Sequence, residues 1–128
     1  MPDPVEVVAA VVERDGRYLI TRRLEGTHLA GLWEFPGGKI LPGEKPEDAL
    51  RRELKEELGV QAAVGELIQT VDWTYPEKSV RILFFRCTLA GEPTPIEGQE
   101  MRWVAGADLA SYSFPDADAT LIARLSGR

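Results

Sequence analysis

The sequence predicts an α+β fold in which a mixed β-sheet lies between helices. Strand-like runs recur along the chain, and residues 46–58 and 116–125 show the apolar spacing of amphipathic helices. The helices alternate with strands instead of following them as a block. At 128 residues the chain can bury a real core, and we expect one domain over residues 1–128.

Strands are expected at residues 5–12, 17–21, 62–73, 80–89 and 100–104. Asp15 and Gly16 predict a hairpin turn between the first two strands. Residues 75–78 predict a turn between the third and the fourth. Loops are expected at residues 24–31 and 90–95, and residues 106–110 fit one helical turn. We treat residues 32–39 as a connecting segment with paired glycines.

The helix predicted at Pro46–Leu58 carries start and stop signals. Pro46 suits the first helical position, and Glu47 and Asp48 are favourable in the first turn. Gly59 suits a left-handed stop. Both ends of this helix are therefore defined by the sequence.

Three carboxylates gather on one side of this helix. At about 100° per residue, Glu53, Glu56 and Glu57 (the acidic ridge) fall within an arc of about 100° beside a stripe of leucines. Such neighbours repel by roughly 0.2–0.5 kcal/mol per pair. A solvated face is the usual explanation of a glutamate-rich helix. The alternative is a bound cation, and carboxylate oxygens suit Mg²⁺ or Mn²⁺.

The surrounding residues favour the cation. From Gly38 to Val60 the chain matches, at every fixed position, the pattern G-x5-E-x7-R-E-U-x-E-E-x-G-U, where U is a bulky aliphatic residue. This segment resembles the Nudix box, the signature of hydrolases that cleave nucleoside diphosphates linked to another group. The resemblance implies an α/β/α sandwich with a central mixed sheet.

Other segments extend the resemblance over nearly the whole chain. They are ITRR (20–23), His28, LWEFPGGKI (32–40), EGQ (97–99) and FPDAD (114–118). They are similar to segments of MutT-type pyrophosphohydrolases, which convert a nucleoside triphosphate to the monophosphate and pyrophosphate. The implied role is sanitation of the nucleotide pool, in support of DNA repair, with 8-oxo-dGTP favoured. CTP or 5-methyl-dCTP, or another nucleoside diphosphate derivative such as a dinucleotide or ADP-ribose, is the alternative.

The acidic ridge is expected to hold the metal, with a backbone carbonyl of Gly37 or Gly38 completing its ligands. By the resemblance, Arg52 orients the catalytic glutamate. Glu44 lies just before the helix, and we expect it to have a supporting role at the site. Glu97 resembles a distal loop glutamate of this subfamily, as a further ligand or catalytic group. A catalytically silent Nudix-like module would be expected to lack ridge carboxylates, and none is missing.

Three carboxylates are candidates for the general base that activates water. A bound metal lowers the pKa of its water, and a carboxylate then takes the proton during in-line attack. Glu53 is favoured by the box and Glu97 by its loop position. Glu100 is the third candidate, although it also fits an ordinary surface acid.

Substrate contacts are implied by the same resemblance. Arg23 would contact a phosphate or a base edge, Lys78 would offer a second cation, and His28 lies in the matching loop. Phe35 and Tyr75 could flank the base, since aromatic stacking is worth roughly 1–3 kcal/mol per base. Phe35 fits a core position equally well.

One departure concerns recognition of the base. Where enzymes for oxidised guanine carry Asn, this chain has Asp118. Asn donates and accepts, whereas ionised Asp only accepts. It could accept from guanine N1–H and N2–H₂, from the N7–H of 8-oxoguanine, or from the N4 amine of cytosine. Asp118 cannot donate to guanine O6 unless it is protonated, which burial would promote. This weakens the case for 8-oxo-dGTP and strengthens that for cytosine. Helix capping is an alternative role for residues 116–118.

The net charge of −6 argues against a nucleic-acid or membrane surface. It would also repel a polyphosphate unless cations screen it. The single cysteine, Cys87, permits no internal disulfide, so a reducing cytoplasm is expected. We expect no signal peptide, no membrane span, and a monomer or weak dimer.

Overall fold

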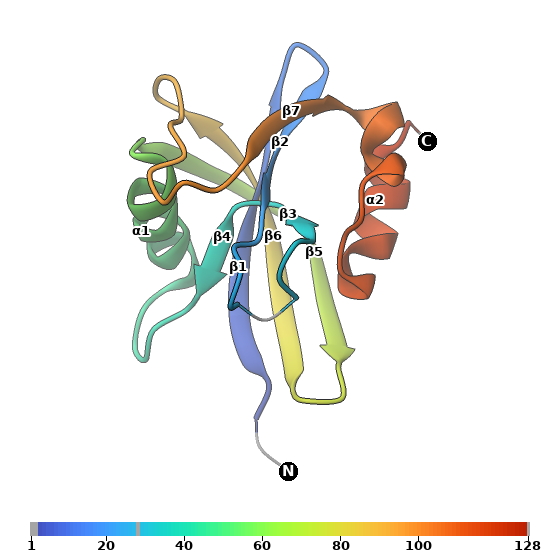
Figure 1. Cartoon of the computed structure of the whole chain (residues 1–128). Coiled ribbons are helices and arrows are strands. Elements are labelled where there is room, and N and C mark those ends of the chain that lie inside the picture. The colour runs from blue at the N-terminus through green and yellow to red at the C-terminus, as the bar shows by residue number, and fades with distance from the viewer. Residues whose placement is uncertain (1–2, 28, 128) are drawn as a thin grey trace.

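The computed structural model describes residues 3–27 and 29–127 as a mixed sheet between helices, which confirms the predicted sandwich (Figure 1). The sheet consists of β1 (Val5–Arg14), β2 (Arg17–Arg22), β3 (Trp33–Glu34), β4 (Gly37–Lys39), β5 (Ala62–Thr74), β6 (Ser79–Leu89) and β7 (Met101–Ala105). Its main order is β3-β2-β1-β6-β5, while β4 pairs with β1 and β7 with β2. β1 and β6 are parallel, and the other pairs are antiparallel.

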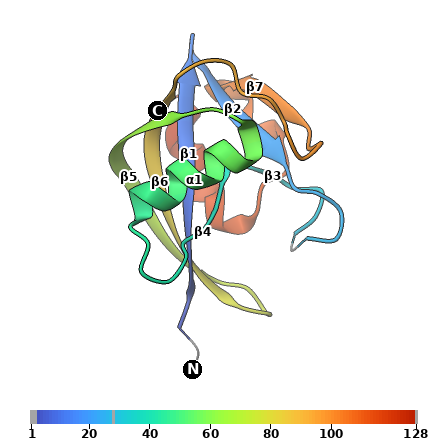
Figure 2. The same cartoon turned by 90° about the vertical axis from the view of Figure 1, so that its left-hand side faces the viewer.

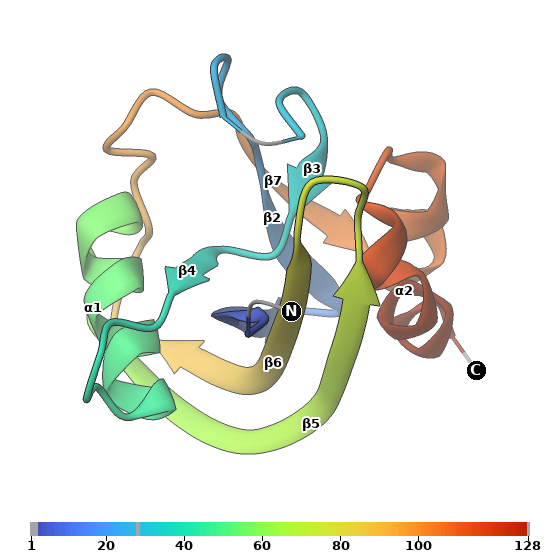
Figure 3. The same ribbon diagram turned by 90° about the horizontal axis from the view of Figure 1, so that it is seen from below.

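Helices cover both faces of the sheet, as the view from below shows (Figure 3). α1 (Pro46–Leu58) has the bounds that the sequence predicts, and Gly59 ends it in the left-handed region at φ 63°. On the other face lie a 3-10 helix (Gly106–Ser111), a 3-10 turn (Asp116–Asp118) and α2 (Ala119–Leu125). No helix among the described residues is long and apolar enough to cross a membrane.

β1 separates two apolar cores. Val8, Ala10 and Val12 belong to the core under α1, whereas Ala9 and Val11 belong to the core under α2. Figure 2 shows α1 lying across the first of these faces. Because both faces of β1 are covered, its sequence is a continuous apolar run and does not alternate.

The expected strands and the hairpin turn are present, with ends that differ by one or two residues. The segment 32–39 differs more, because the structure places β3 and β4 there. β4 lies beside β1, with Gly37 opposite Ala9 and Gly38 opposite Val8. Its partner is distant in sequence, and two glycines give no alternating pattern, so no local signal predicts this strand. The predicted helix 116–125 also begins as a 3-10 turn and becomes α-helical only at Ala119.

Gly37 has no room for a side chain. A Cβ at this position would collide with the carbonyl oxygen of Val8 and with the Cα of Ala9 in β1. We therefore expect Gly37→Ala to lower the free energy of unfolding by about 1–3 kcal/mol, the usual cost of overpacking. Urea unfolding followed by circular dichroism measures this change. An unchanged unfolding midpoint would show that β1 and β4 can separate at no cost.

Candidate active site

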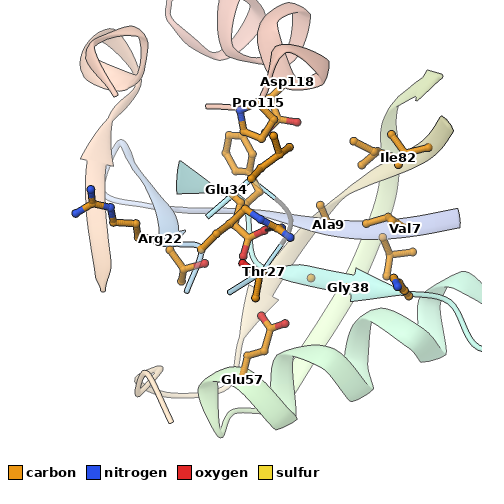
Figure 4. A pocket seen from close by; sticks show the side chains of 18 of the residues that line it. Val7, Ala9, Arg22, Thr27, Glu34, Gly38, Glu57, Ile82, Pro115 and Asp118 are labelled. Atoms are coloured by element: carbon orange, nitrogen blue, oxygen red, sulfur yellow. Dashed lines mark hydrogen bonds and ion pairs between the residues drawn. The ribbon is translucent and has the colours of Figure 1, made fainter. Parts of the chain in front are cut away.

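A pocket of about 330 Å³ opens between the sheet, α1 and the turn that precedes α2 (Figure 4). Its polar lining comes from Thr21, Arg22, Arg23, Thr27, Glu34, Lys39, Glu57, Tyr75, Lys78, Glu97, Gln99 and Asp118. Asp118 lies at one end, Glu57 on α1 lies at the other, and Glu34 lies between them. The pocket therefore reaches from the acidic ridge to the predicted base-reading residue.

Two members of the acidic ridge share a hydrogen bond. The carboxyl groups of Glu53 and Glu57 bond to each other, while Glu56 is more exposed. Burial raises the pKa of Glu53. Burial, together with the charges of Glu34 and Glu53, raises the pKa of Glu57 to about 9. This crowding of carboxylates is the electrostatic setting that a divalent cation would relieve.

The ridge fits a divalent cation by its chemistry, because carboxylate oxygens are the ligands that Mg²⁺ prefers. Within the described residues, no three side chains of His, Cys, Asp or Glu surround a common point as metal ligands. The carboxyl groups of Glu53 and Glu57 bond to each other in this structure. Binding a cation would require them to exchange this bond for metal contacts.

Arg52 joins the ridge to the loop before α1. Its Nε and Nη2 donate to the two carboxylate oxygens of Glu44 at 2.9 and 3.0 Å. Its Nη1 donates to Glu53 Oε2 at 3.1 Å, and Nη2 also donates to the Lys39 carbonyl at 3.0 Å. The hydrogen bond from Arg52, with one from the Leu41 N–H, lowers the pKa of Glu44. Glu44 therefore stays ionised and holds Arg52 where it restrains Glu53.

Gly38 allows α1 to approach β4. A Cβ on Gly38 would collide with the carboxyl group of Glu53. The two glycines thus make room for different neighbours. The missing side chain at Gly37 lets β4 lie against β1, and the one at Gly38 leaves space for the carboxyl group of Glu53. Whether a carbonyl of either glycine binds a metal stays a prediction.

Asp118 is buried at the far end of the pocket, with 5% of its surface exposed. Burial and the charge of Glu34 raise the pKa of Asp118 to about 7, against the opposing effect of Arg23. Asp118 precedes α2 but makes no capping hydrogen bond. The Tyr75 hydroxyl accepts a hydrogen bond from the Ala117 N–H at 3.2 Å, which ties Tyr75 to the turn that carries Asp118. Because Asp118 makes no capping hydrogen bond, the structure disfavours the capping role that the sequence left open for this segment.

Phe35 lines the pocket but is a core residue, only 3% exposed. Its ring stacks on Phe114 with centroids 5.5 Å apart and meets Phe84 edge to face at 6.1 Å. The sequence left two roles open for Phe35, and these contacts support the structural one, packing in the core under α2. A base in the pocket would meet little of its ring.

Cations also line the pocket. Burial and the charges of Lys39 and Arg23 lower the pKa of Lys78, so these three groups lie close enough to interact. Arg23 donates from Nη1 to Glu34 Oε1 at 2.6 Å. A polyphosphate can therefore meet local positive charge although the chain is acidic overall. The predicted contact from His28 lies outside the described residues.

The three candidate bases occupy different environments. Glu97 is exposed at the rim of the pocket, and its charge contributes to the raised pKa of Glu57. Glu100 does not line the pocket and instead pairs with Arg22 at 2.8 Å and Arg102 at 3.7 Å. Glu97 lines the pocket; Glu53 does not, but its carboxyl group contacts that of Glu57, which does, whereas Glu100 has neither relation to the pocket.

Glu34 lies at the centre of the pocket and was not predicted as a site residue. Burial raises the pKa of Glu34, and its ion pair with Arg23 opposes this shift. A signal was present, because Glu34 is a charged residue between the buried aromatic side chains of Trp33 and Phe35. Thr21, Lys39 and Gln99 also line the pocket without having been predicted.

The sandwich fold and the acidic ridge beside a cation-lined pocket define a hydrolase that acts on phosphate anhydrides. Comparisons with known proteins agree, because a model of the NUDIX domain matches residues 7–124. The chain belongs to the Nudix family of hydrolases, whose members generally use divalent metal ions.

Three similar proteins cover most of the chain. The 8-oxo-dGTP diphosphatase of Haemophilus influenzae is 42% identical over 94% of this chain and 90% of its own length. The CTP pyrophosphohydrolase of Escherichia coli is 38% identical over 92% and 88%. The solution structure of the E. coli ORF135 protein superimposes with a TM-score of 0.82 at 36% identity, over 93% and 86%.

Proposed function

We propose that this chain hydrolyses a nucleoside triphosphate to the monophosphate and pyrophosphate, with Mg²⁺ as the cofactor and Mn²⁺ as a substitute. One observation supports the proposal: a single pocket extends from Glu57 of the acidic ridge at one end to the buried carboxyl group of Asp118, the proposed base-reading group, at the other. The names of the relatives support a nucleotide substrate. We favour 8-oxo-dGTP, which would make the enzyme a sanitiser of the nucleotide pool.

In this mechanism, Glu53, Glu56 and Glu57 would hold the cation, with Glu97 as a further ligand. The cation supplies charge neutralisation and a more acidic water. Glu53, restrained by Arg52, takes the proton from the attacking water. The favoured point of attack is the β-phosphorus.

Cations of the pocket would bind the phosphates of the substrate. Lys39, Lys78 and Arg23 line the pocket, and Lys39 extends from the strand that also carries Gly38. Attack of water at the β-phosphorus forms a new P–O bond in pyrophosphate and breaks the bond to the oxygen that bridges the α- and β-phosphates, so the monophosphate leaves with that oxygen. The lysines would stabilise the negative charge that develops on this leaving oxygen.

Asp118 favours a second candidate substrate. When ionised, its carboxylate accepts hydrogen bonds, and the N4 amine of cytosine offers a donor. CTP or 5-methyl-dCTP is therefore the alternative substrate. The CTP pyrophosphohydrolase among the relatives supports it.

A substrate panel tests the proposal. 8-oxo-dGTP, dGTP, CTP, 5-methyl-dCTP and ADP-ribose would be compared by kcat/KM with Mg²⁺, and the products separated by ion-exchange chromatography. We expect a triphosphate to rank first and to yield pyrophosphate. In ¹⁸O-water, attack at the β-phosphorus should label pyrophosphate and leave the monophosphate unlabelled. Preference for ADP-ribose, or release of inorganic phosphate, would contradict the proposal.

We propose a reducing cytoplasm as the compartment of the protein, and this proposal depends on its cysteine and not on the pocket. Cys87 is a free thiol buried in the core under α1. Burial raises the pKa of this thiol to about 12, so it would remain a reduced, unreactive core side chain. A reducing cytoplasm suits such a residue.

A further inference from the structure

The loop that carries Glu97 is fastened to the end of α1. In Figure 1 this loop, orange, runs from β6 past α1 to β7. The Thr94 N–H donates to the Leu58 carbonyl at 2.9 Å, and the Ile96 N–H donates to the Glu57 carbonyl at 3.0 Å. The last carbonyls of a helix have no partner within the helix, and here the loop supplies the donors.

Gln99 adds a connection of a different kind. It is a buried polar residue, 7% exposed, and it lines the pocket. Its Oε1 accepts from the Glu97 N–H at 3.0 Å, and its Nε2 donates to the Glu57 carbonyl at 3.2 Å. The Glu97 N–H can only donate and the Glu57 carbonyl can only accept, so the orientation of the Gln99 amide is fixed.

A single side chain therefore joins the backbone of Glu97 to the backbone of Glu57. The side chains of both residues line the same pocket, which Glu34 also lines. Glu97 itself is exposed on a turn closed by the Gly98 N–H and the Pro95 carbonyl, at 3.1 Å. Without Gln99, this turn would keep the backbone bonds of Thr94 and Ile96 to α1 on one side and the bond from the Arg22 N–H to the Glu100 carbonyl, at 3.0 Å, on the other.

We infer that Gln99 is a positioning residue that holds Glu97 against the acidic ridge, so that both act on the same bound cation. The inference rests on the proposed function, in which Glu97 approaches the cation. Gln99 itself would touch neither the cation nor the reacting atoms. Misplacement of a catalytic group by about 1 Å can cost up to about 100-fold in rate, so a residue with this task should have a measurable effect.

The experiment is a double-mutant cycle on the full-length protein with Gln99→Met, Glu97→Gln and the pair. Methionine keeps the unbranched shape of glutamine but removes both hydrogen bonds. The Glu57 carbonyl keeps its bond from Ile96, so we expect the variant to fold. Gln61→Met is the matched control, because Gln61 is exposed and does not line the pocket. Should Gln99→Met not fold, Gln99→Leu would take its place in the same cycle.

Two readouts separate positioning from general support of the fold. The first is kcat with saturating Mg²⁺, which we expect Gln99→Met to lower about 10-fold, with no further loss when it is added to Glu97→Gln. The second is Mn²⁺ binding without substrate, measured by electron paramagnetic resonance. It should weaken about as much in Gln99→Met as in Glu97→Gln.

The outcomes distinguish this inference from the proposed function. Losses that multiply in the double variant, or Mn²⁺ binding that Gln99→Met leaves unchanged, would overturn the role of Gln99 alone. Full activity and Mn²⁺ binding in Glu97→Gln would remove Glu97 from the proposed site, and the inference about Gln99 would fall with it.

Discussion

Glu53→Gln is expected to lower kcat by about 10³-fold with little change in KM. Glu53 is the proposed base and a proposed metal ligand, and removal of a general base alone costs about 10²–10⁴-fold. Glutamine keeps the size of the side chain and can still accept from Arg52, which lies 3.1 Å from the carboxylate. Steady-state pyrophosphate release measures the loss. A variant with more than about a tenth of wild-type kcat would exclude Glu53 as the base.

The control is Glu47→Gln on the same helix. Glu47 is exposed in the first turn of α1 and does not line the pocket, so kcat should be unchanged. Glu100→Gln extends the comparison to the third candidate base. Because Glu100 does not line the pocket and its ion pairs with Arg22 and Arg102 are exposed, we expect a loss of less than about 3-fold.

Asp118→Asn is expected to reorder the substrate panel in a pH-dependent way. The pKa of Asp118 is about 7, so the wild-type group is mostly protonated at pH 6 and mostly ionised at pH 8. Protonated Asp118 can donate to guanine O6, whereas the ionised form can only accept. The ratio of kcat/KM for 8-oxo-dGTP to that for CTP should therefore fall about 10-fold from pH 6 to pH 8, the loss of roughly one hydrogen bond.

Asparagine does not titrate, so the same ratio should be nearly constant with pH in Asp118→Asn. The variant should favour 8-oxo-dGTP at both pH values, because Asn can donate and accept. Measuring the ratio, and not either rate alone, removes the pH dependence that both substrates share through the acidic ridge. A wild-type ratio that does not change with pH, or an unchanged ranking in the variant, would place base recognition elsewhere.

Asp118 also links folding to pH. Its pKa in the folded chain, about 7, lies above its ordinary value of 3.8, so the folded state binds the proton more tightly. The resulting contribution to stability is complete below about pH 3.8 and is lost as the pH rises through about 7. The free energy of unfolding should therefore fall less between pH 5.5 and pH 8 in Asp118→Asn than in the wild type. Urea titrations at the two pH values measure the difference.

The sequence predicts best those features that local chemistry determines. α1 is defined by Pro46 at its start, a leucine stripe and Gly59 at its end, and its bounds match the prediction. The grouping of the acidic ridge follows from helix geometry alone. The contact of Arg52 with Glu53 was implied by family resemblance, and the structure shows it. The contact of Arg52 with Glu44 was not predicted.

Features that depend on distant partners were not predicted. β4 forms because β1 lies beside it, and Gln99 can donate to the Glu57 carbonyl because α1 ends nearby. Glu34 looks like a surface residue until the pairing of β2 with β3 and the burial of its neighbours are known. In each case the information lies in contacts between segments that are separated along the chain.

The parallel pairing of β1 with β6 has a consequence for how the chain acquires its fold. Val5 lies opposite Val80 and Val12 opposite Cys87, so the centre of the sheet joins the beginning of the chain to residues synthesised much later. Contacts between such distant segments slow folding, because a long loop must close before they form. During synthesis, the apolar first strand must therefore wait for this partner until residue 87 has left the ribosome.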